Sequence, residues 1–215
     1  MTVHFTSDLH IGHRRVAEIR GFSSAHEHDE HLAASWRAVV KPADQVWVLG
    51  DIAASSPTRA LEVLADLPGE KHLIFGNHDT AHPMNRDAHR HLRTYLEVFA
   101  SAASAARRRI NGREVVLSHF PYRRDRGPAR HQQWRLRDEG LWLLHGHTHG
   151  PETLTYGERE IHVGLDAWAL KPVALETIAD LLEAAENRRQ STARLDALFA
   201  AGRRNGEKLA AEVAE

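Results

Sequence analysis

Three histidines stand at alternating positions in one short stretch of the chain. His145, His147 and His149 follow an apolar run at 141–144, and a glycine lies after the first and the last of them. Alternate residues of an extended segment point to one side, so the three imidazole rings could converge. Neutral imidazole is the commonest protein ligand of transition metals. The stretch therefore predicts a metal site, and it leaves open which of the three rings bind.

Further side chains of metal-ligand type stand where other predicted strands end. They are aspartate, histidine and one asparagine: Asp8, His10, Asp51, Asn77 and His119. Ligand sites in open α/β sheets collect at the carboxyl ends of the strands. We therefore expect these five side chains at one rim of the sheet, together with the histidines of the 145–149 stretch.

The size of this set predicts two metal ions. His147 and His149 complete a set of seven protein ligands with the five side chains above. Seven ligands are too many for a single catalytic ion that keeps an open position, whereas the two oxygens of Asp51 can bridge two cations. Oxygen and imidazole donors without sulfur suit Mn, Fe, Zn, Ni or Co. Two such ions about 3.5–4 Å apart are the usual arrangement for phosphoester hydrolysis. A bound ion brings the pKa of water to about 7, which makes hydroxide available as the nucleophile.

The elements that must position these ligands alternate at first and become strand-rich later. Hydrophobic patterning and turn residues predict strands at 2–7, 45–49, 72–75, 114–118, 141–144, 160–163 and 173–176. Helices are predicted at 26–40, 57–67 and 85–98, with one or two more from 178 to 215 and a break near Gly202. Residues 120–140 are basic and polar and are predicted to form a loop over a site. This order indicates an α/β fold.

Composition limits the remaining possibilities. The 215 residues are 42% hydrophobic, which suits one core at 1–177 with an appendage at 178–215. The absence of cysteine excludes disulfides and thiolate metal sites, and the net charge of -1 gives no global sign of a nucleic-acid partner. No apolar run approaches the roughly 20 residues of a membrane span, and no secretory signal precedes the first strand. A cytoplasmic protein without membrane association is expected.

Five short motifs occur in order between residues 8 and 149: Asp8-x-His10, Gly50-Asp51, Gly76-Asn77-His78-Asp79, His119, and Gly146-His147-x-His149. Together they resemble the calcineurin-like metallophosphoesterase superfamily. The local sequences at Ser7–His13, Ser118–Pro121 and Val163–Trp168 are similar to those of its small bacterial and phage members. The resemblance implies a four-layer α/β/β/α sandwich of two mixed sheets and a metal-dependent phosphoesterase. The residues beyond 178 lie outside it and form the helical C-terminal extension.

The resemblance also implies a role for each ligand. On the family pattern the first metal takes Asp8, His10, Asp51 and His149, and the second takes Asp51, Asn77, His119 and His147. It places His78 beside the phosphate, where it stabilises charge or protonates the leaving oxygen, and it makes Asp79 the carboxylate that orients His78. His145 is then surplus, and we expect it to pack at the end of its strand.

Substrate contacts and substrate class stay open at this level. His13, Tyr122 and Arg123 are candidates for contacts with the phosphate, as are Arg14 and Arg124, with solvated loop residues as the alternative. The basic residues of the 120–140 loop could accept a nucleotide or nucleic acid, or could equally be solvated: Arg123, Arg124, Arg126, Arg130, Arg135 and Arg137.

The resulting prediction is a two-metal phosphoester hydrolase that leans to phosphodiesters, since His10 is compatible with that activity in the family. A phosphomonoesterase and a non-catalytic binding module on the same fold are the alternatives. Apolar stripes in the C-terminal helical region fit either packing onto the body or a dimer contact, so a monomer and a homodimer both remain possible.

Overall fold

The structure is a computed structural model that describes residues 1–54, 56–123, 130–155 and 159–213, without the side chains of 155 and 198–213. The chain divides into two compact units, residues 1–178 and residues 179–215. Every predicted metal ligand belongs to the first unit. In the second unit, residues 179–213 continue a single helix that begins at Leu175.

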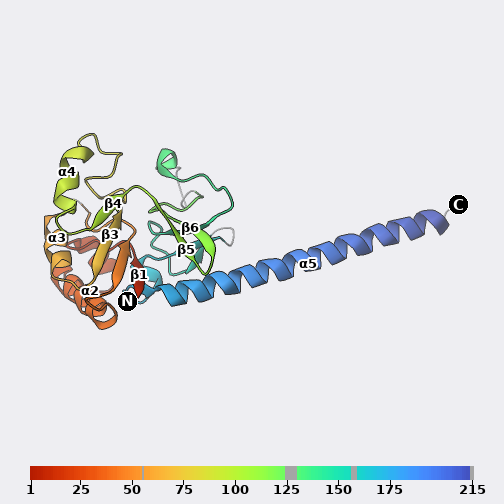
Figure 1. Cartoon of the computed structure of the whole chain (residues 1–215), viewed down its shortest axis with the longest axis horizontal. Coiled ribbons are helices and arrows are strands. Elements are labelled where there is room, and N and C mark those ends of the chain that lie inside the picture. Colours follow the sequence, from red (N-terminus) through yellow and green to blue (C-terminus); the bar gives the residue numbers. More distant parts are fainter. Residues whose placement is uncertain (55, 124–129, 156–158, 214–215) are drawn as a thin grey trace. The chain divides into compact units, whose positions relative to one another are not determined.

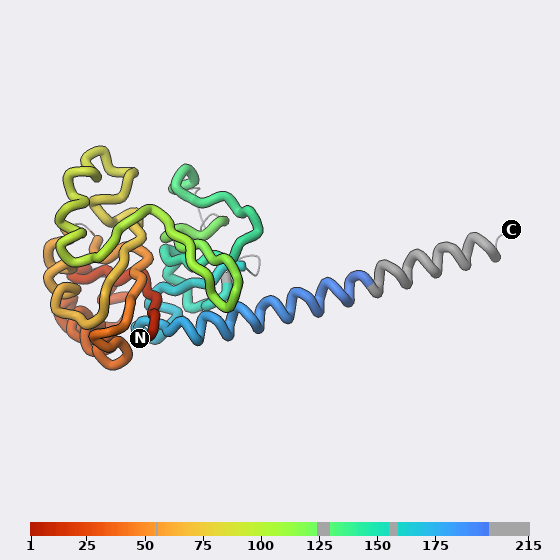
Figure 2. The backbone as a smooth tube through the Cα atoms, viewed as in Figure 1, coloured from red at the N-terminus to blue at the C-terminus, as the bar shows by residue number. Residues whose placement is uncertain are grey.

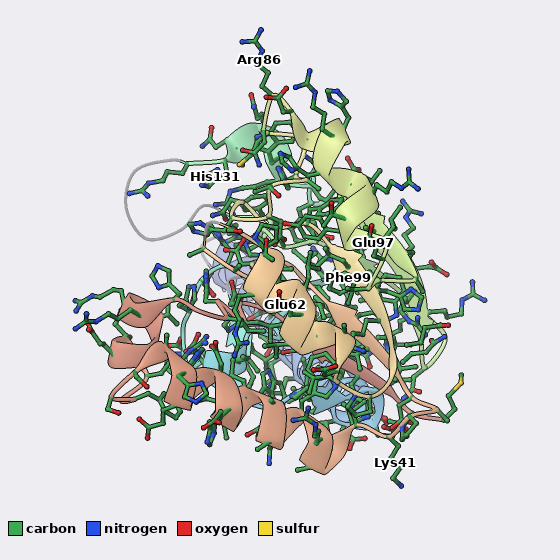
Figure 3. The ribbon with its side chains drawn as sticks, turned by 90° about the vertical axis from the view of Figure 1, so that its left-hand side faces the viewer. Lys41, Glu62, Arg86, Glu97, Phe99 and His131 are labelled. Carbon is green, nitrogen blue, oxygen red and sulfur yellow. The ribbon has the colours of Figure 1, made fainter. Side chains whose placement is uncertain are left out.

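The first sheet has the strand order β10-β1-β2-β3-β4. Strands β1 (Val3–Thr6), β2 (Gln45–Val48), β3 (Glu70–Ile74) and β4 (Ser101–Ala103) run parallel, and β10 (Val173–Ala174) pairs antiparallel with β1. Helices α2 (Ala25–Val39), α3 (Thr58–Ala65) and α4 (Ala88–Tyr95) lie together on one side of this sheet (Figures 1 and 3). The parallel strands therefore all end at the same edge.

The core between this sheet and its helices is formed in part by alternate residues of β2, whose side chains point to one face of the sheet. Val46 and Val48 of β2 are completely buried and pack in one cluster with Trp36 of α2 and Leu64 of α3. Burying a side chain of this size stabilises the fold by about 1.5–3 kcal/mol. The indole N–H of Trp36 donates to the carbonyl oxygen of Pro68 at 3.0 Å, so its one polar group is satisfied.

The second sheet has the order β5-β6-β7-β9-β8. It consists of β5 (Ala106–Ile110), β6 (Arg113–Leu117), β7 (Trp142–His145), β9 (Glu160–His162) and β8 (Leu154–Thr155), with β6, β7 and β9 parallel. The chain passes from the first sheet to the second between β4 and β5 (Figure 2). A parallel bridge between Ser7 and Gly164 joins the segment after β1 to the segment after β9. The predicted α/β class with two mixed sheets is confirmed.

One short helix and three strands were not predicted from the sequence. Helix α1 (Arg14–Ile19) is capped by the His13 ring, whose Nδ1 accepts from the Val16 N–H, and histidine is outside the usual set of capping residues. Strand β5 contains three consecutive arginines, which obscured its alternation. Strands β4 and β8 are only three and two residues long. Two 3-10 turns are also present, η1 (Gln132–Trp134) in the loop predicted at 120–140 and η2 (Leu165–Ala167) between two predicted strands.

Most predicted elements match to within about two residues at each end, and the largest differences lie in the helix after β3 and in the C-terminal part. The helix predicted at 85–98 covers only Ala88–Tyr95. The strand predicted at 173–176 ends at Ala174, because helix α5 (Leu175–Val213) begins at the next residue and continues through Gly202 without a break. No helix in the described part of the chain has both the length and the apolar character that a membrane crossing requires.

Candidate metal centre

The ends of five strands deliver the predicted ligands to one place. Asp8 follows β1, Asp51 follows β2, Asn77 follows β3, His119 follows β6, and His147 follows β7. The first three strands belong to one sheet and the last two to the other. The candidate site therefore lies where the carboxyl ends of the parallel strands of both sheets meet.

The first group of ligands consists of Asp8, His10 and His149. One potential ligand atom from each lies within 4.8 Å of the other two. The Nε2 atoms of His10 and His149 are 3.2 Å apart, and His149 Nε2 is 3.8 Å from Asp8 Oδ1. The two rings stack with their centroids 5.0 Å apart. This spacing suits three donors around one small cation.

The second group consists of Asp51, His119 and His147, again with donor atoms within 4.8 Å of one another. His119 Nε2 lies 3.5 Å from Asp51 Oδ2 and 3.2 Å from His147 Nδ1. The predicted neutral ligand joins this group, since Asn77 Oδ1 is 3.2 Å from His119 Nε2. The other ring nitrogen of His119 lies 2.7 Å from the carbonyl oxygen of Leu49. When Nδ1–H donates there, the Nε2 lone pair is left for a metal.

The carboxylate of Asp51 lies between the two groups. Its Oδ2 is 3.8 Å from His10 Nε2 in the first group and 3.5 Å from His119 Nε2 in the second. Its Oδ1 accepts the backbone N–H of His78 at 2.9 Å, which fixes the orientation of the carboxylate. A side chain held in this position has the geometry expected of a bridge between two cations.

The backbone at the site is held in an unusual conformation. Asp8, His10, Asp51, His147 and His149 all have positive φ, at 60°, 48°, 55°, 72° and 51°. The left-handed region costs a non-glycine residue on the order of 1–3 kcal/mol. Such strain persists only where surrounding structure fixes it, and it is concentrated at functional sites.

Glycine is required beside the ligands because the chain segments approach closely. A Cβ on Gly76 would clash with Asp51 Oδ1, and a Cβ on Gly146 would clash with Ser7 Oγ and lie 2.6 Å from Asp8 Oδ2. The φ of Gly146 is not positive. Gly146 is therefore needed for the close approach of two loops, and not to free the backbone for a turn.

Burying several acidic groups together perturbs their ionisation. Burial raises the pKa of Asp51 to about 7, and the nearby Asp8 carboxylate adds to this. Burial also acts to raise the pKa of Asp8, but the imidazoles of His149, His119 and His10 outweigh it and hold this pKa below its usual range. Burial lowers the pKa of His10 to about 3. An unprotonated His10 beside buried carboxylates fits a divalent cation, which would compensate the buried negative charge.

Asp79 does not orient His78, contrary to the prediction. Its buried carboxylate accepts three backbone N–H groups, from Gly76 at 2.7 Å, Asp51 at 3.1 Å and Ile52 at 3.2 Å. Burial and the neighbouring Asp51 raise its pKa to about 7. Asp79 therefore ties the loop after β3 to the loop after β2, and so holds Asp51 in place.

His78 lies at the open side of the first group. Its side chain is 45% exposed, with Nε2 4.0 Å from Asp51 Oδ2. Its ring packs edge-on against the ring of His10, with the centroids 5.4 Å apart. Its Nδ1 lies 3.3 Å from the carbonyl oxygen of Ala54. An accessible imidazole beside the candidate ligands could reach a group bound between them.

The sequence did not reveal the residues that hold His149. Its Nδ1 is 2.9 Å from Asp166 Oδ2. Asp166 is held in turn by Arg20, whose Nε and Nη2 donate to the two carboxylate oxygens at 2.8 and 2.9 Å. Arg20 Nη2 also donates to the carbonyl oxygen of Asp8 at 2.8 Å. Arg20 and Asp166 are 146 positions apart in the chain, so no local pattern could have paired them.

Two other histidines lie near the second group. The ring of His131 stacks on Phe120 at 5.3 Å and lies 5.6 Å from the ring of His147, on a loop for which the sequence had suggested only basic residues. His145 is fully buried in β7 and stacks on His162, and neither group of candidate ligands includes it. Burial lowers the pKa of His145 to about 3. These positions agree with a packing role for His145.

The candidate substrate contacts are not all near the centre. The His13 ring lies 5.9 Å from that of His10, but its Nδ1 already caps α1. Tyr122 donates its hydroxyl to the carbonyl oxygen of Leu141 at 3.2 Å and lines a pocket that includes neither ligand group, so its contact with phosphate stays a prediction. The exposed Arg123 contacts neither ligand group among the described residues, and its carbonyl oxygen accepts from Arg135 at 2.8 Å.

The basic loop is partly engaged in local contacts. Arg135 also donates to the carbonyl oxygen of Pro121 at 2.9 Å and lies over the ring of Phe120. Arg137 pairs with Glu139 at 3.0 Å. Arg124 and Arg126 lie outside the described residues. The arginines that the structure describes hold the loop together as much as they offer charge to a substrate.

Known proteins resemble the chain in sequence and in fold. Residues 1–172 match the family model described as the calcineurin-like phosphoesterase superfamily domain. The Gene 66 protein of Mycobacterium phage L5 is 48% identical over 192 residues, which cover 83% of this chain and 92% of that protein. The Gene 66 protein of Mycobacterium phage D29 is 51% identical, covering 77% and 88%. A protein of unknown function from Aquifex aeolicus, AQ665, shares the fold at a TM-score of 0.63 with 21% identity, covering 84% of this chain and 98% of its own.

Proposed function

Because the chain belongs to the calcineurin-like phosphoesterase superfamily, we propose that it hydrolyses phosphoesters with two divalent metal ions that share Asp51. The first ion has Asp8, His10, Asp51 and His149 as its ligands. The second has Asp51, Asn77, His119 and His147. The substrate class proposed is the phosphodiester, and the phosphomonoester is the alternative.

One observation carries the two-metal proposal. Asp51 Oδ2 lies within 4 Å of a histidine from each group, at 3.8 Å from His10 Nε2 and 3.5 Å from His119 Nε2. A single site would need only one of the two groups. Two complete groups on either side of one carboxylate support a pair of ions at the short separation used in phosphoester hydrolysis.

The donor set indicates which ions fit and what they would contribute. Carboxylate, amide and imidazole donors suit Mn²⁺, with Fe, Zn, Ni and Co as the other candidates. Such ions neutralise charge on phosphoryl oxygens and acidify water. Burial lowers the pKa of His10 to about 3 and thereby keeps this proposed ligand unprotonated.

His78 is proposed to act directly on the substrate. Its exposed ring lies beside Asp51 and edge-on to His10, at the open side of the centre. From there Nε2 can donate to a phosphoryl oxygen or to the oxygen of the leaving group. Asp79 then acts indirectly, because it holds the two loops that carry Asp51 and His78.

The preference for phosphodiesters rests on the sequence resemblance at the Asp8-x-His10 motif. His10 is buried at 3% exposure and belongs to the first ligand group. A nucleotide or nucleic-acid substrate is a further proposal, supported only by the exposed arginines of the loop that follows His119.

The test uses purified protein loaded with Mn²⁺ and assayed on bis-p-nitrophenyl phosphate and on p-nitrophenyl phosphate. We expect metal-dependent release of nitrophenol that is faster with the diester and is abolished by a chelator. A protein shown to hold two ions that turns over neither substrate would refute the proposed activity. Faster turnover of the monoester would refute the diester preference alone.

A further inference from the structure

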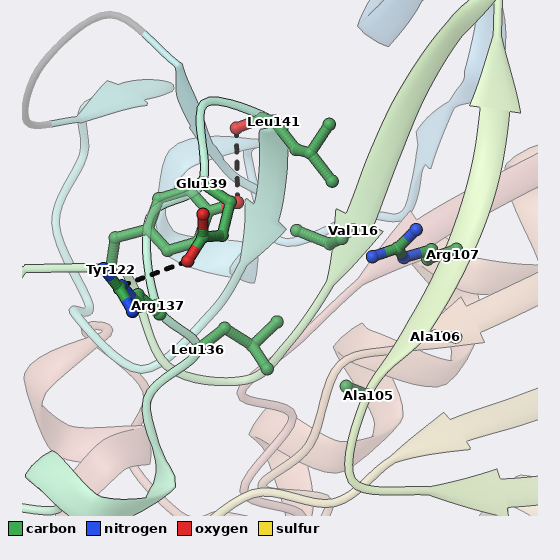
Figure 4. Close-up of a pocket in the computed structure, with 9 residues that line it drawn as sticks. All are labelled: Ala105, Ala106, Arg107, Val116, Tyr122, Leu136, Arg137, Glu139 and Leu141. Atoms are coloured by element: carbon green, nitrogen blue, oxygen red, sulfur yellow. Dashed lines mark hydrogen bonds and ion pairs between the residues drawn. The ribbon is translucent and has the colours of Figure 1, made fainter.

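A second pocket lies outside the candidate metal centre (Figure 4). Its volume is about 460 Å³, within the range of about 300–1,000 Å³ found for small-molecule sites. No residue of the two metal-ligand groups is among the described residues that line it: Ala105, Ala106, Arg107, Val116, Tyr122, Leu136, Arg137, Glu139 and Leu141. The pocket is therefore a separate cavity, formed between the second sheet and the loop that follows β6.

The floor of the pocket is formed by the paired strands β5 and β6. Arg107 and Val116 stand directly opposite each other in this pair, so their side chains lie on the same face of the sheet. The neighbours Val115 and Leu117 point to the other face and are fully buried. Ala105 and Ala106, where β5 begins, complete this part of the lining. The pocket thus lies on the face of the sheet opposite to that of Val115 and Leu117.

The walls are apolar and include one fixed aromatic ring. The side chains of Val116, Leu136 and Leu141 point into the pocket (Figure 4). The hydroxyl of Tyr122 donates to the carbonyl oxygen of Leu141 at 3.2 Å, which fixes the orientation of the ring. Burial raises the pKa of Tyr122 to about 12, so this hydroxyl stays protonated and remains a donor near neutral pH. Such walls favour an apolar or aromatic body.

The charges around the pocket leave one positive group without compensation. Arg137 Nε and Glu139 Oε1 pair at 3.0 Å and so balance each other. Nearby, Asp138 pairs with Arg159 at 3.9 Å. Arg107, by contrast, has no carboxylate within 4.0 Å in the part of the chain that the structure describes. A guanidinium beside an apolar cavity favours an anionic group on the ligand.

We propose that this pocket binds a small organic anion, which has an apolar or aromatic body and one carboxylate, sulfonate or phosphate group. The body packs against Tyr122, Val116 and Leu136, and the anionic group pairs with Arg107. This site is distinct from the metal centre, and its ligand need not be the substrate that is hydrolysed there.

The probe for this site is 8-anilinonaphthalene-1-sulfonate, an aromatic anion whose fluorescence rises in apolar surroundings. It is titrated into the metal-loaded full chain and into two variants. Val116→Trp fills the pocket, and Arg107→Gln removes the cation. Arg109→Gln is the matched control, because Arg109 lies two residues along the same face of β5 but pairs with Glu114 at 2.9 Å. Metal content, measured on every variant, confirms that each has folded.

The expected result is saturable binding that weakens tenfold or more in Arg107→Gln and in Val116→Trp, and stays within twofold of the wild type in Arg109→Gln. Inorganic phosphate, which binds at the metals, should not displace the probe. The proposal is overturned if the probe does not saturate or if phosphate competes with it. It is also overturned if Arg107→Gln, with its metals intact, binds the probe as well as the wild type does. None of these outcomes depends on phosphoesterase turnover.

Discussion

The strained ligands are the most informative single residues of this protein. Asp8, His10, Asp51, His147 and His149 all have positive φ, although glycine would adopt this conformation without the steric cost. Glycine has no side chain that binds a metal, so side chains of metal-ligand type at these positions fit the proposed centre despite the steric cost of their backbone conformation. The hydrogen bonds that hold the strained residues include both oxygens of Asp8, which accept the His147 N–H at 3.1 and 2.9 Å.

Replacing His78 by alanine should separate chemistry from metal binding. The His78 side chain belongs to neither ligand group, so His78→Ala should keep both ions. Its hydrolysis rate should fall about 100-fold or more, in the range of general acid catalysis. Metal analysis and steady-state kinetics on bis-p-nitrophenyl phosphate test this, with the exposed His91 of α4 replaced by alanine as the control. A rate close to that of the wild type would remove His78 from the mechanism.

Glu160 should make stability depend on pH. Burial raises the pKa of its carboxyl from 4.5 to about 7, and the side chain accepts the Tyr122 N–H at 2.6 Å. Between these pH values the folded chain holds a proton that the unfolded chain releases, so stability falls as pH rises through this window, by on the order of 1–3 kcal/mol. Glu160→Gln removes this loss and keeps an acceptor for the N–H.

Thermal unfolding of Glu160→Gln and the wild type at pH 5 and pH 8 measures this effect. The variant should gain more over the wild type at pH 8 than at pH 5. An equal difference at both values would show that Glu160 does not ionise in this range in the folded protein.

At the scale of elements, the strand ends place the ligands and the helices and turns hold them. The edge where β1, β2 and β3 end supplies Asp8, Asp51 and Asn77, and β6 and β7 supply His119 and His147. Helix α1 contributes through the residue that ends it, since Arg20 is its C-cap and reaches Asp166 in the turn η2. A short helix remote in sequence thereby fixes a ligand on the loop after β7.

Arg20→Met should therefore weaken metal binding without removing a ligand. Asp166 loses its partner, and His149 loses the group that orients its ring. Loss of such an orienting partner typically costs about 10–100-fold in metal affinity. Competition with a chelator measures the affinity, and Arg14→Met is the control, because Arg14 lies on the same helix with its side chain 86% exposed.

Asp166→Asn is the second variant for this test, since it keeps the shape of the side chain if Arg20→Met folds poorly. Affinity in either folded variant equal to that of the Arg14→Met control would contradict the role assigned to Arg20 and Asp166.

At the scale of the whole molecule, the division of the chain predicts that the distal helix is dispensable for hydrolysis. All the proposed ligands lie in residues 1–178, and residues 179–215 form the separate unit. A chain that ends at residue 196 should keep two metals and turn over bis-p-nitrophenyl phosphate within twofold of the full chain. Light scattering on both chains shows whether the helix also carries a dimer contact. Loss of metal from the shortened chain would contradict the prediction.

The sequence predicted which candidate ligands come together better than it predicted the elements around them. Asp8, Asp51 and His119 each follow an apolar run, so the same stretch of sequence predicted both the end of a strand and a candidate ligand. The strand β5 was missed because Arg107 and Arg109 are exposed and Arg108 packs over the ring of Trp47, which no alternation of apolar residues signals.

The network around the ligands could not be predicted for a different reason. The bond between Arg20 and Asp166 spans 146 positions, and sequence patterns report on neighbours along the chain. The role expected of Asp79 was wrong because its three backbone donors come from two loops that meet only in the folded protein.

The proposal that two metal ions share the Asp51 carboxylate is tested most directly by counting the metal ions bound per chain. Inductively coupled plasma mass spectrometry is applied to the wild type, to Asp51→Ala and to the control Asp87→Ala, whose carboxylate is exposed on the surface. Two ions per chain are predicted in the wild type and in the control, and neither ion should be retained in Asp51→Ala. One ion per chain in the wild type, or two tightly held ions in Asp51→Ala, would contradict a centre built on that bridge.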